Sequence, residues 1–218
     1  MDSLKNRLGK DYIKKQDNLE DYFKSLAEEL FKFYVIQKGD IQYWLTDIEF
    51  YLYHDQRRDI ITYPRNCKAG EWFFHPSGVD IAFESHVKKK GKKATLTQDA
   101  FFGGILIRGI KRIVPKGEDI LFDGPMLSCD ELFDRFDAFG EVKNFPKLVR
   151  VAKDLPYDKP LAEKRYNLKK DAEEKVSSIL SNNYTPLEDE RLKDELIQAY
   201  RHYWDKEYRY TRYSKKRS

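Results

Sequence analysis

Two carboxylates interrupt an aromatic and apolar run in the N-terminal half of the chain. The stretch WLTDIEFYLYHD, residues 44–55, contains Asp47 and Glu49 and otherwise has the composition of a buried strand. Strands rarely bury carboxylates, because moving a charge out of water is costly unless the charge is paired. A carboxylate that is partly desolvated among aromatic rings has a raised pKa, and this suits it to act as a general base.

Arg108 is the third side chain that could take part in this chemistry. It lies in AFFGGILIRGIKRIV, residues 100–114, an apolar run in which an arginine needs a partner or a pocket. It could hold a carboxylate ionised, or orient a water or a substrate. Alternatively, Arg108 and one of the acids form a partly buried ion pair with a structural role. Space for a water beside Glu49 would indicate an enzyme, whereas a closed, fully buried pair would indicate the structural role.

A strand over residues 41–53 is expected to position the two acids. Successive side chains of a strand point to opposite faces. The face that carries the acids consists of Tyr43, Leu45, Asp47, Glu49 and Tyr51. The other face is mostly apolar and consists of Trp44, Thr46, Ile48, Phe50 and Leu52. The second set predicts the core face, and the first predicts the wall of a cleft.

Patterns elsewhere predict a mixture of strands and helices. Helical spacing predicts a helix over 17–34, capped by Asp17 or Asn18. Two strands with a turn at 76–78 are expected within 70–85, and a third strong strand over 100–114. Ser128 and Glu131 form a capping-box pattern and predict that a helix begins there.

The last third of the chain has helical patterns after an irregular segment. A helix is expected over about 171–181, and another from Thr185 to about Trp204, with Glu188 completing a capping box. The order of elements predicts an α+β fold, a single domain with a mainly antiparallel, curved sheet flanked by helices. We expect residues 1–145 to form the core and 146–218 a helical, basic C-terminal extension packed on or next to it.

Composition narrows the classes of protein that are possible. The fractions of charged residues, 36%, and of aromatic residues, 15%, are typical of a soluble, ordered domain. No apolar run approaches the ~18 residues of a membrane span, and the N-terminus lacks the apolar segment of a secretory signal. Cys67 and Cys129 have no Cys or His pairing around them, so we expect neither disulfides nor a metal site. These features predict a cytoplasmic protein with no cofactor, and a monomer is favoured.

The net charge of +4 is modest, but the basic residues are clustered. One cluster is the segment VKKKGKK, whose lysines are Lys88, Lys89, Lys90, Lys92 and Lys93. The other is the tail RHYWDKEYRYTRYSKKRS, in which Arg209 and Arg212 alternate with aromatic residues. Both patterns suit a nucleic-acid backbone, and the tail could also stack on bases. The alternatives are a solvated lysine turn and an ordinary basic tail.

An ordered set of short motifs resembles the alkyladenine (3-methyladenine) DNA glycosylase family. LTDIEFY resembles that family's TE-x-EAY strand, and YPRN its TPRN loop. GGILIRGI resembles the strand AVLLRALEP, and GPMLSCDEL the segment GPG-x-L-x-x-AL. The segment HPSGVDIAFES lies where the family has PPG-x-x-YVY-x-x-YG. The resemblance covers residues 26–135, about half of the chain.

The resemblance implies roles for several residues. Glu49 matches a glutamate that activates water for cleavage of the N-glycosidic bond, and Arg108 matches an arginine near that water. Tyr51 matches a tyrosine that stacks on a flipped-out base, and His54 is the nearest counterpart of a second stacking residue. Asp80 falls at a pocket position, where it could bind an exocyclic amine, favour a cationic ligand or act as a second carboxylate. Asp47 is expected to support the site or to pair with a basic side chain.

The sequence departs from the family at the residue that enters the duplex. Ser85 lies where the family has a wedge tyrosine, and a serine cannot fill the gap left by an extruded base. Phe83 or His86 could take its place. Three functions therefore remain open. The first is a DNA glycosylase that excises a modified purine. The second is an N-glycosidase for nucleosides, nucleotides or single-stranded nucleic acid. The third is a non-catalytic nucleic-acid-binding module.

Overall fold

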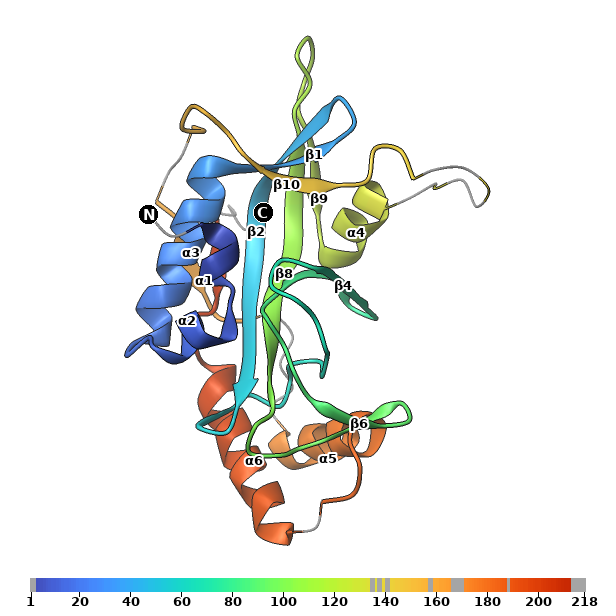
Figure 1. The fold of residues 1–218 in the computed structure, drawn as a ribbon. Helices are drawn as coiled ribbons and strands as arrows, with labels where there is room; N and C mark the ends of the chain where they lie inside the picture. Colours follow the sequence, from blue (N-terminus) through green and yellow to red (C-terminus); the bar gives the residue numbers. More distant parts are fainter. Residues whose placement is uncertain are drawn as a thin grey trace.

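The structure of the chain is a computed structural model, shown in Figure 1. It describes residues 3–133, 136, 139, 142–156, 159–165, 171–187 and 189–212. Within these residues it has an α+β architecture built on a mainly antiparallel sheet, as the sequence predicts. No helix among the described residues is long and apolar enough to cross a membrane. Cys67 and Cys129 are free thiols.

Three helices precede the sheet and cover one side of it. They are α1 (Leu4–Arg7), α2 (Lys10–Lys14) and α3 (Leu19–Phe33). Asn18 caps α3, since its side chain accepts hydrogen bonds from the backbone N–H groups of Glu20 and Asp21. The apolar side of α3 packs on the sheet, where the ring of Phe23 stacks on Phe50 with 4.6 Å between centroids. This confirms the predicted helix and one of its two predicted caps.

The main sheet is organised around two long strands, β2 (Ile41–His54) and β8 (Phe101–Arg112). Its strand order is β10-β1-β2-β8-β5-β4, and the other elements of this path are β1 (Tyr34–Lys38), β4 (Trp72–His75), β5 (Gly78–Ala82) and β10 (Lys147–Arg150). Short strands complete it, namely β3 (Arg57–Arg58), β9 (Ile120–Asp123), β11 (Leu161–Glu163) and β12 (Arg209–Thr211). A separate hairpin pairs β6 (Lys88–Lys90) with β7 (Lys93–Thr95).

A double irregularity in the β2–β8 pairing corrects the predicted faces of β2. Leu45 pairs with Ile110 and Asp47 with Gly109, so the register skips Thr46. The next pair, Ile48 with Ile107, skips Arg108 on the other strand. An extra residue reverses the alternation beyond it. Tyr43 and Leu45 are therefore buried in the core together with Ile48, Phe50 and Leu52, and are not part of a cleft wall.

Three later helices flank the sheet, and two of them begin elsewhere than predicted. Helix α4 (Pro125–Phe133) already includes Ser128, which is buried and donates its backbone N–H to the Gly124 carbonyl, so it is not a cap. Helix α5 (Ala172–Asn183) is close to its predicted range. Helix α6 (Glu190–Trp204) begins after Asp189, which caps it, and the predicted capping-box residue Glu188 lies outside the described residues.

The C-terminal third is part of the sheet as well as helical. Strand β10 pairs with β1, β12 pairs with the middle of β2, and β11 pairs with β12. The expectation of a helical extension beyond residue 145 is therefore correct for α5 and α6 and wrong for these strands. Both helices pack over the ends of β2 and β8, on a second core that includes Tyr53, Phe102, Val176, Leu196 and Tyr200 (Figure 1).

Candidate functional site

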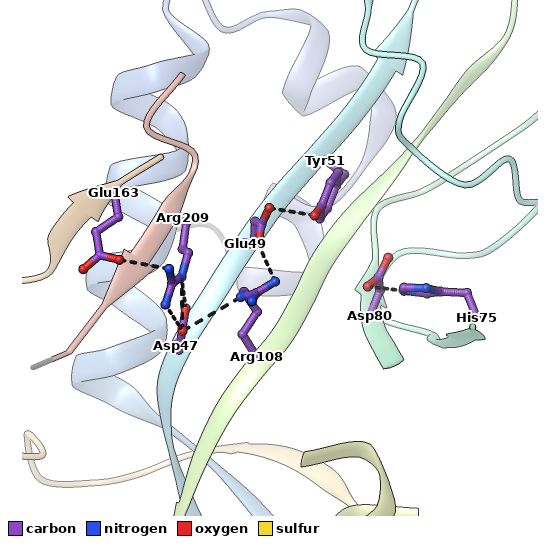
Figure 2. Close-up of polar contacts among 8 residues, drawn as sticks. All are labelled: Asp47, Glu49, Tyr51, His75, Asp80, Arg108, Glu163 and Arg209. Atoms are coloured by element: carbon purple, nitrogen blue, oxygen red, sulfur yellow. Dashed lines mark hydrogen bonds and ion pairs between the residues drawn. The ribbon is translucent and has the colours of Figure 1, made fainter. Parts of the chain in front are cut away.

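Glu49, Tyr51 and Arg108 meet between β2 and β8. One carboxylate oxygen of Glu49 accepts a hydrogen bond from the Tyr51 hydroxyl at 2.7 Å, and the other accepts one from Nη1 of Arg108 at 2.8 Å (Figure 2). The Glu49 side chain is 0% exposed. Burial raises the pKa of Glu49, and the charge of Arg108 and the Tyr51 hydrogen bond offset this only in part. The geometry is therefore that of a closed, buried pair.

Asp47 lies next to this group of charged residues on β2, but its main partner is on the C-terminal strand β12. Nη2 of Arg209 lies 2.6 Å from one Asp47 oxygen, and Nη1 of Arg209 lies 3.0 Å from Glu163 on β11 (Figure 2). Nε of Arg108 is 3.9 Å from Asp47. Asp47 is thus a partner for basic side chains, and its burial separates it from any substrate.

Arg209 and Arg212 are not available to a nucleic-acid backbone. Both are buried, and Arg209 is fixed by its ion pairs on β12. Arg212 donates to the backbone carbonyls of Leu45, Phe31 and Pro156. The prediction of a nucleic-acid-binding tail is therefore wrong for these residues, because the tail segment is a strand of the sheet and its Tyr208 and Tyr210 belong to the core.

A cavity of about 370 Å³ opens on the other side of Tyr51 and Arg108. We call it the Tyr51–Tyr63 cavity; its polar and aromatic lining includes Tyr51, Tyr63, His75, Asp80, Arg108 and Lys175. Glu49 is not among the lining residues, although both of its hydrogen-bond donors are. The carboxylate therefore lies one side chain behind the cavity wall.

Asp80 lines this cavity with both carboxylate oxygens already engaged. One accepts from Arg65, and the other lies 2.9 Å from Nε2 of His75. Burial alone would raise the pKa of Asp80, but the charge of Arg65 and the contact with His75 outweigh it and hold the pKa below its usual value. Asp80 is thus held ionised at the cavity wall by Arg65 and His75, and its role as an acceptor for an exocyclic amine stays a prediction.

An aromatic surface in this cavity comes from Tyr63 and His75. The two rings lie with centroids 4.7 Å apart, and the Tyr63 hydroxyl is 3.5 Å from the Ser77 hydroxyl. No sequence pattern predicted a role for Tyr63, which stands out only as the first residue of the YPRN motif. Lys175 and Asn183 of α5 were also missed, since nothing in a helical pattern places them beside β4 and β5.

His54 lies away from this cavity. It is at the end of β2, stacks on Phe101 at 5.7 Å and lines a different cavity. Burial, together with the charges of Arg57 and Lys14, lowers the pKa of His54 to about 4. Its predicted role as a base-stacking partner of Tyr51 is therefore wrong. Ser85 and Phe83 are buried too, so neither offers a wedge toward a duplex, whereas His86 is exposed.

The predicted lysine cluster is exposed and lies near the Tyr51–Tyr63 cavity. All five of its lysines are exposed on the β6–β7 hairpin, with Gly91 at φ +63° in the turn. The hairpin is joined to the end of α5, where the Thr185 N–H donates to the Ala94 carbonyl at 2.8 Å. Figure 1 shows the hairpin beside α5. Because α5 also lines the cavity, the hairpin adjoins one of the elements that form the cavity wall.

Comparison with known proteins finds a distant relative. The chain is 29% identical over 132 residues to "Uncharacterized protein L759" of Acanthamoeba polyphaga mimivirus. The match covers 54% of this chain and 59% of the viral protein, so the chain spans less than two thirds of that relative. No family model and no solved structure matches the chain.

Proposed function

We propose that this protein binds nucleic acid and accommodates a nucleobase in the Tyr51–Tyr63 cavity. The observation that carries the proposal is the composition of the cavity. Its aromatic surface, Tyr63 against His75, offers a face on which a base can stack. Its volume of about 370 Å³ is within the range of small-molecule sites. Lys175 of α5 supplies positive charge at its wall, and the lysine hairpin borders the end of this helix.

Binding of a base is tested with a single-stranded oligonucleotide and the same strand carrying one abasic position. Tyr63→Ala removes the stacking ring and is expected to weaken binding by about 1–3 kcal/mol, as loss of a base–aromatic stack does. Tyr63→Phe is the matched control, because it keeps the ring and loses only the hydroxyl. Equal affinity of Tyr63→Ala and Tyr63→Phe for the intact strand would exclude a stacked base at this position.

Hydrolysis of the N-glycosidic bond is the second candidate function. The closed Glu49–Arg108 pair argues against it in this conformation, and the observation in its favour is the raised pKa of Glu49 directly behind the cavity wall. In this reaction the base leaves with the electrons of its bond to C1′, the oxygen of a water adds to C1′, and a carboxylate takes the proton of that water. Glu49 is bonded to two residues of the cavity wall, so it is the nearest carboxylate with a raised pKa. The reaction requires that Tyr51 or Arg108 turns away from Glu49 when a base enters.

Base release from a panel of alkylated and deaminated substrates decides between the two functions. The panel includes duplex DNA, single-stranded DNA and free nucleosides, because the buried Ser85 argues against invasion of a duplex. If the protein is a hydrolase, Glu49→Gln abolishes release and leaves oligonucleotide binding intact. Binding without release from any substrate, together with a lower Tm for Glu49→Gln, would identify Glu49 and Arg108 as a structural pair.

A further inference from the structure

Arg57 is a buried cation for which the described part of the chain supplies no anionic partner. It lies on β3, and the residue is only 6% exposed. Nε and Nη2 are buried and have no hydrogen-bond partner among the described residues. No carboxylate of the described residues forms an ion pair with it, since the acids nearest in the sequence, Asp55 and Asp59, pair with Arg58 and Arg165.

The other buried arginines of the described chain show that this arrangement is unusual. Arg65, Arg165 and Arg209 each contact a buried aspartate, and Arg212 donates to backbone carbonyls. Arg57 is held by rings instead, with its guanidinium carbon 4.6 Å from the centroid of Tyr208, 4.7 Å from Tyr203 and 5.3 Å from Phe23. Cation–π contacts offset part of the cost of burying the charge, but they supply no oxygen to the N–H groups.

Arg57 lines a cavity of about 620 Å³, separate from the Tyr51–Tyr63 cavity, which we call the Arg57 cavity. Its walls come from α2, the N-terminal end of α3, the β2–β3 turn and the C-terminal end of α6, and they include the basic residues Lys14, His54, Arg57, His202 and Lys206. The first turn of α3 also borders it, but this turn is capped by Asn18 and contains Glu20 and Asp21, so it adds no net positive charge. His54 is neutral because its pKa is lowered to about 4.

Three carboxylates line the same cavity, and two of them are already neutralised. Glu20 lies 2.7 Å from Nζ of Lys206, and Asp55 lies 3.2 Å from Arg58. Asp17 is the third and is exposed. The charges that remain after these pairings are Arg57 and Lys14 against Asp17, which leaves the buried end of the cavity positive.

We propose that the Arg57 cavity is an oxyanion site that takes a phosphate group, with Arg57 as the buried ligand and Lys14 as the cation at the entrance. The planar guanidinium matches two oxygens of a phosphate, and the rings of Tyr203 and Tyr208 already hold it in place. The cavity is larger than a phosphate ion alone, so it also has room for a phosphomonoester such as a mononucleotide.

The test is a titration of the full chain with inorganic phosphate, with chloride added to keep the ionic strength constant. Binding is measured by calorimetry and by the shift in Tm. We expect saturable binding that Arg57→Met weakens by about 30-fold, since a hydrogen bond to a charged group contributes about 1.5–3 kcal/mol. Lys14→Gln is expected to weaken it about threefold. Lys24→Gln, an exposed lysine of α3 outside the cavity, is the matched control and leaves the affinity unchanged.

Two results would overturn the proposal. One is the absence of saturable phosphate binding to the wild-type chain, and the other is equal phosphate affinity of the wild type and Arg57→Met. Acetate and citrate are titrated in parallel, and equal binding of these carboxylates would reject phosphate as the preferred anion. If Arg57→Met does not fold, Lys14→Gln decides the matter, because its exposed side chain is not needed for packing. Unchanged phosphate affinity in that variant counts against the site.

Discussion

In the Tyr51–Tyr63 cavity buried charges occur in pairs, whereas the Arg57 cavity contains a buried cation surrounded by aromatic rings. Asp80 has Arg65, and Glu49 behind the wall has Arg108. Arg57 is packed against Phe23, Tyr203 and Tyr208. The pairs rigidify the first cavity and occupy the acids that a substrate would need. The cation of the second cavity keeps hydrogen-bonding capacity, which is a property of a site that receives an anion from solution.

The largest expected effect is the difference in stability lost when two buried arginines are replaced: Arg165, which has a buried carboxylate partner, and Arg57, which has none among the described residues. Arg165 and Asp59 form an ion pair in which both side chains are 0% exposed. Arg165→Met strands the Asp59 carboxylate and is expected to lower the free energy of unfolding by about 3–5 kcal/mol. Arg57→Met strands no anion, so in phosphate-free buffer its cost stays below about 1 kcal/mol. Urea denaturation of both variants measures the difference, and similar losses would contradict the contrast between the cavities.

A smaller loss is expected from filling the space at the β2–β8 irregularity. A Cβ at Gly109 would lie 2.7 Å from Oγ1 of Thr46 and 3.1 Å from Cβ of Asp47. Gly109→Ala therefore forces β2 and β8 apart beside the carboxylates and is expected to cost about 1–3 kcal/mol. The same substitution should leave phosphate binding at the Arg57 cavity unchanged. Thermal unfolding and the phosphate titration check the two parts, and a loss of phosphate binding would show that the cavities are coupled.

The pH dependence of stability should have opposite signs at Glu49 and Asp80. Because the pKa of Glu49 is raised, the folded state retains a proton that the unfolded chain releases, and stability falls as pH rises between the ordinary pKa and the folded one. The pKa of Asp80 is lowered, so its contribution is complete above the ordinary pKa and is lost as pH falls through the folded one.

Urea denaturation across this pH range measures both slopes. Glu49→Gln should flatten the decline on the alkaline side of the ordinary carboxyl pKa, and Asp80→Asn should flatten the decline on the acid side. A variant with the slope of the wild type would show that the residue does not control stability in that range.

The smallest effect on stability is expected at the lysine hairpin. Substitutions there should instead change the binding of single-stranded nucleic acid. Lys89→Ala with Lys90→Ala removes two exposed cations near the Tyr51–Tyr63 cavity. The dependence of single-strand affinity on salt should become shallower by about 1.4 in the logarithmic slope. Phosphate binding at Arg57 should be unaffected. Lys116→Ala with Lys153→Ala is the control, since Lys116 lies in the β8–β9 loop at the opposite end of the molecule (Figure 1). If the double variant and the wild type have the same salt dependence of affinity, the hairpin does not contact the nucleic acid.

Local elements were predicted from the sequence better than the contacts between distant ones. The helix capped by Asn18 and the strand from residue 41 follow from local spacing, and both are confirmed. The reversal at Thr46 does not follow from spacing, because an extra residue inside a strand leaves the apolar composition unchanged. Arg209, the main partner of Asp47, is 162 positions away in the sequence. Local sequence pattern therefore cannot distinguish a basic, aromatic tail from a buried strand, because the difference depends on pairing with a distant strand.

The pairing of β12 with the middle of β2 has a consequence for the order of folding. Residues 209–211 form the backbone hydrogen bonds along the edge of β2 from Asp47 to Glu49. They also bring Arg209 to Asp47. During synthesis the N-terminal strands leave the ribosome first. Until Thr211 has followed them, this edge has unpaired backbone groups and Asp47 lacks its main cation. Strand β12, the last strand among the described residues, is thus the element that completes the pairing of β2 beside the carboxylates.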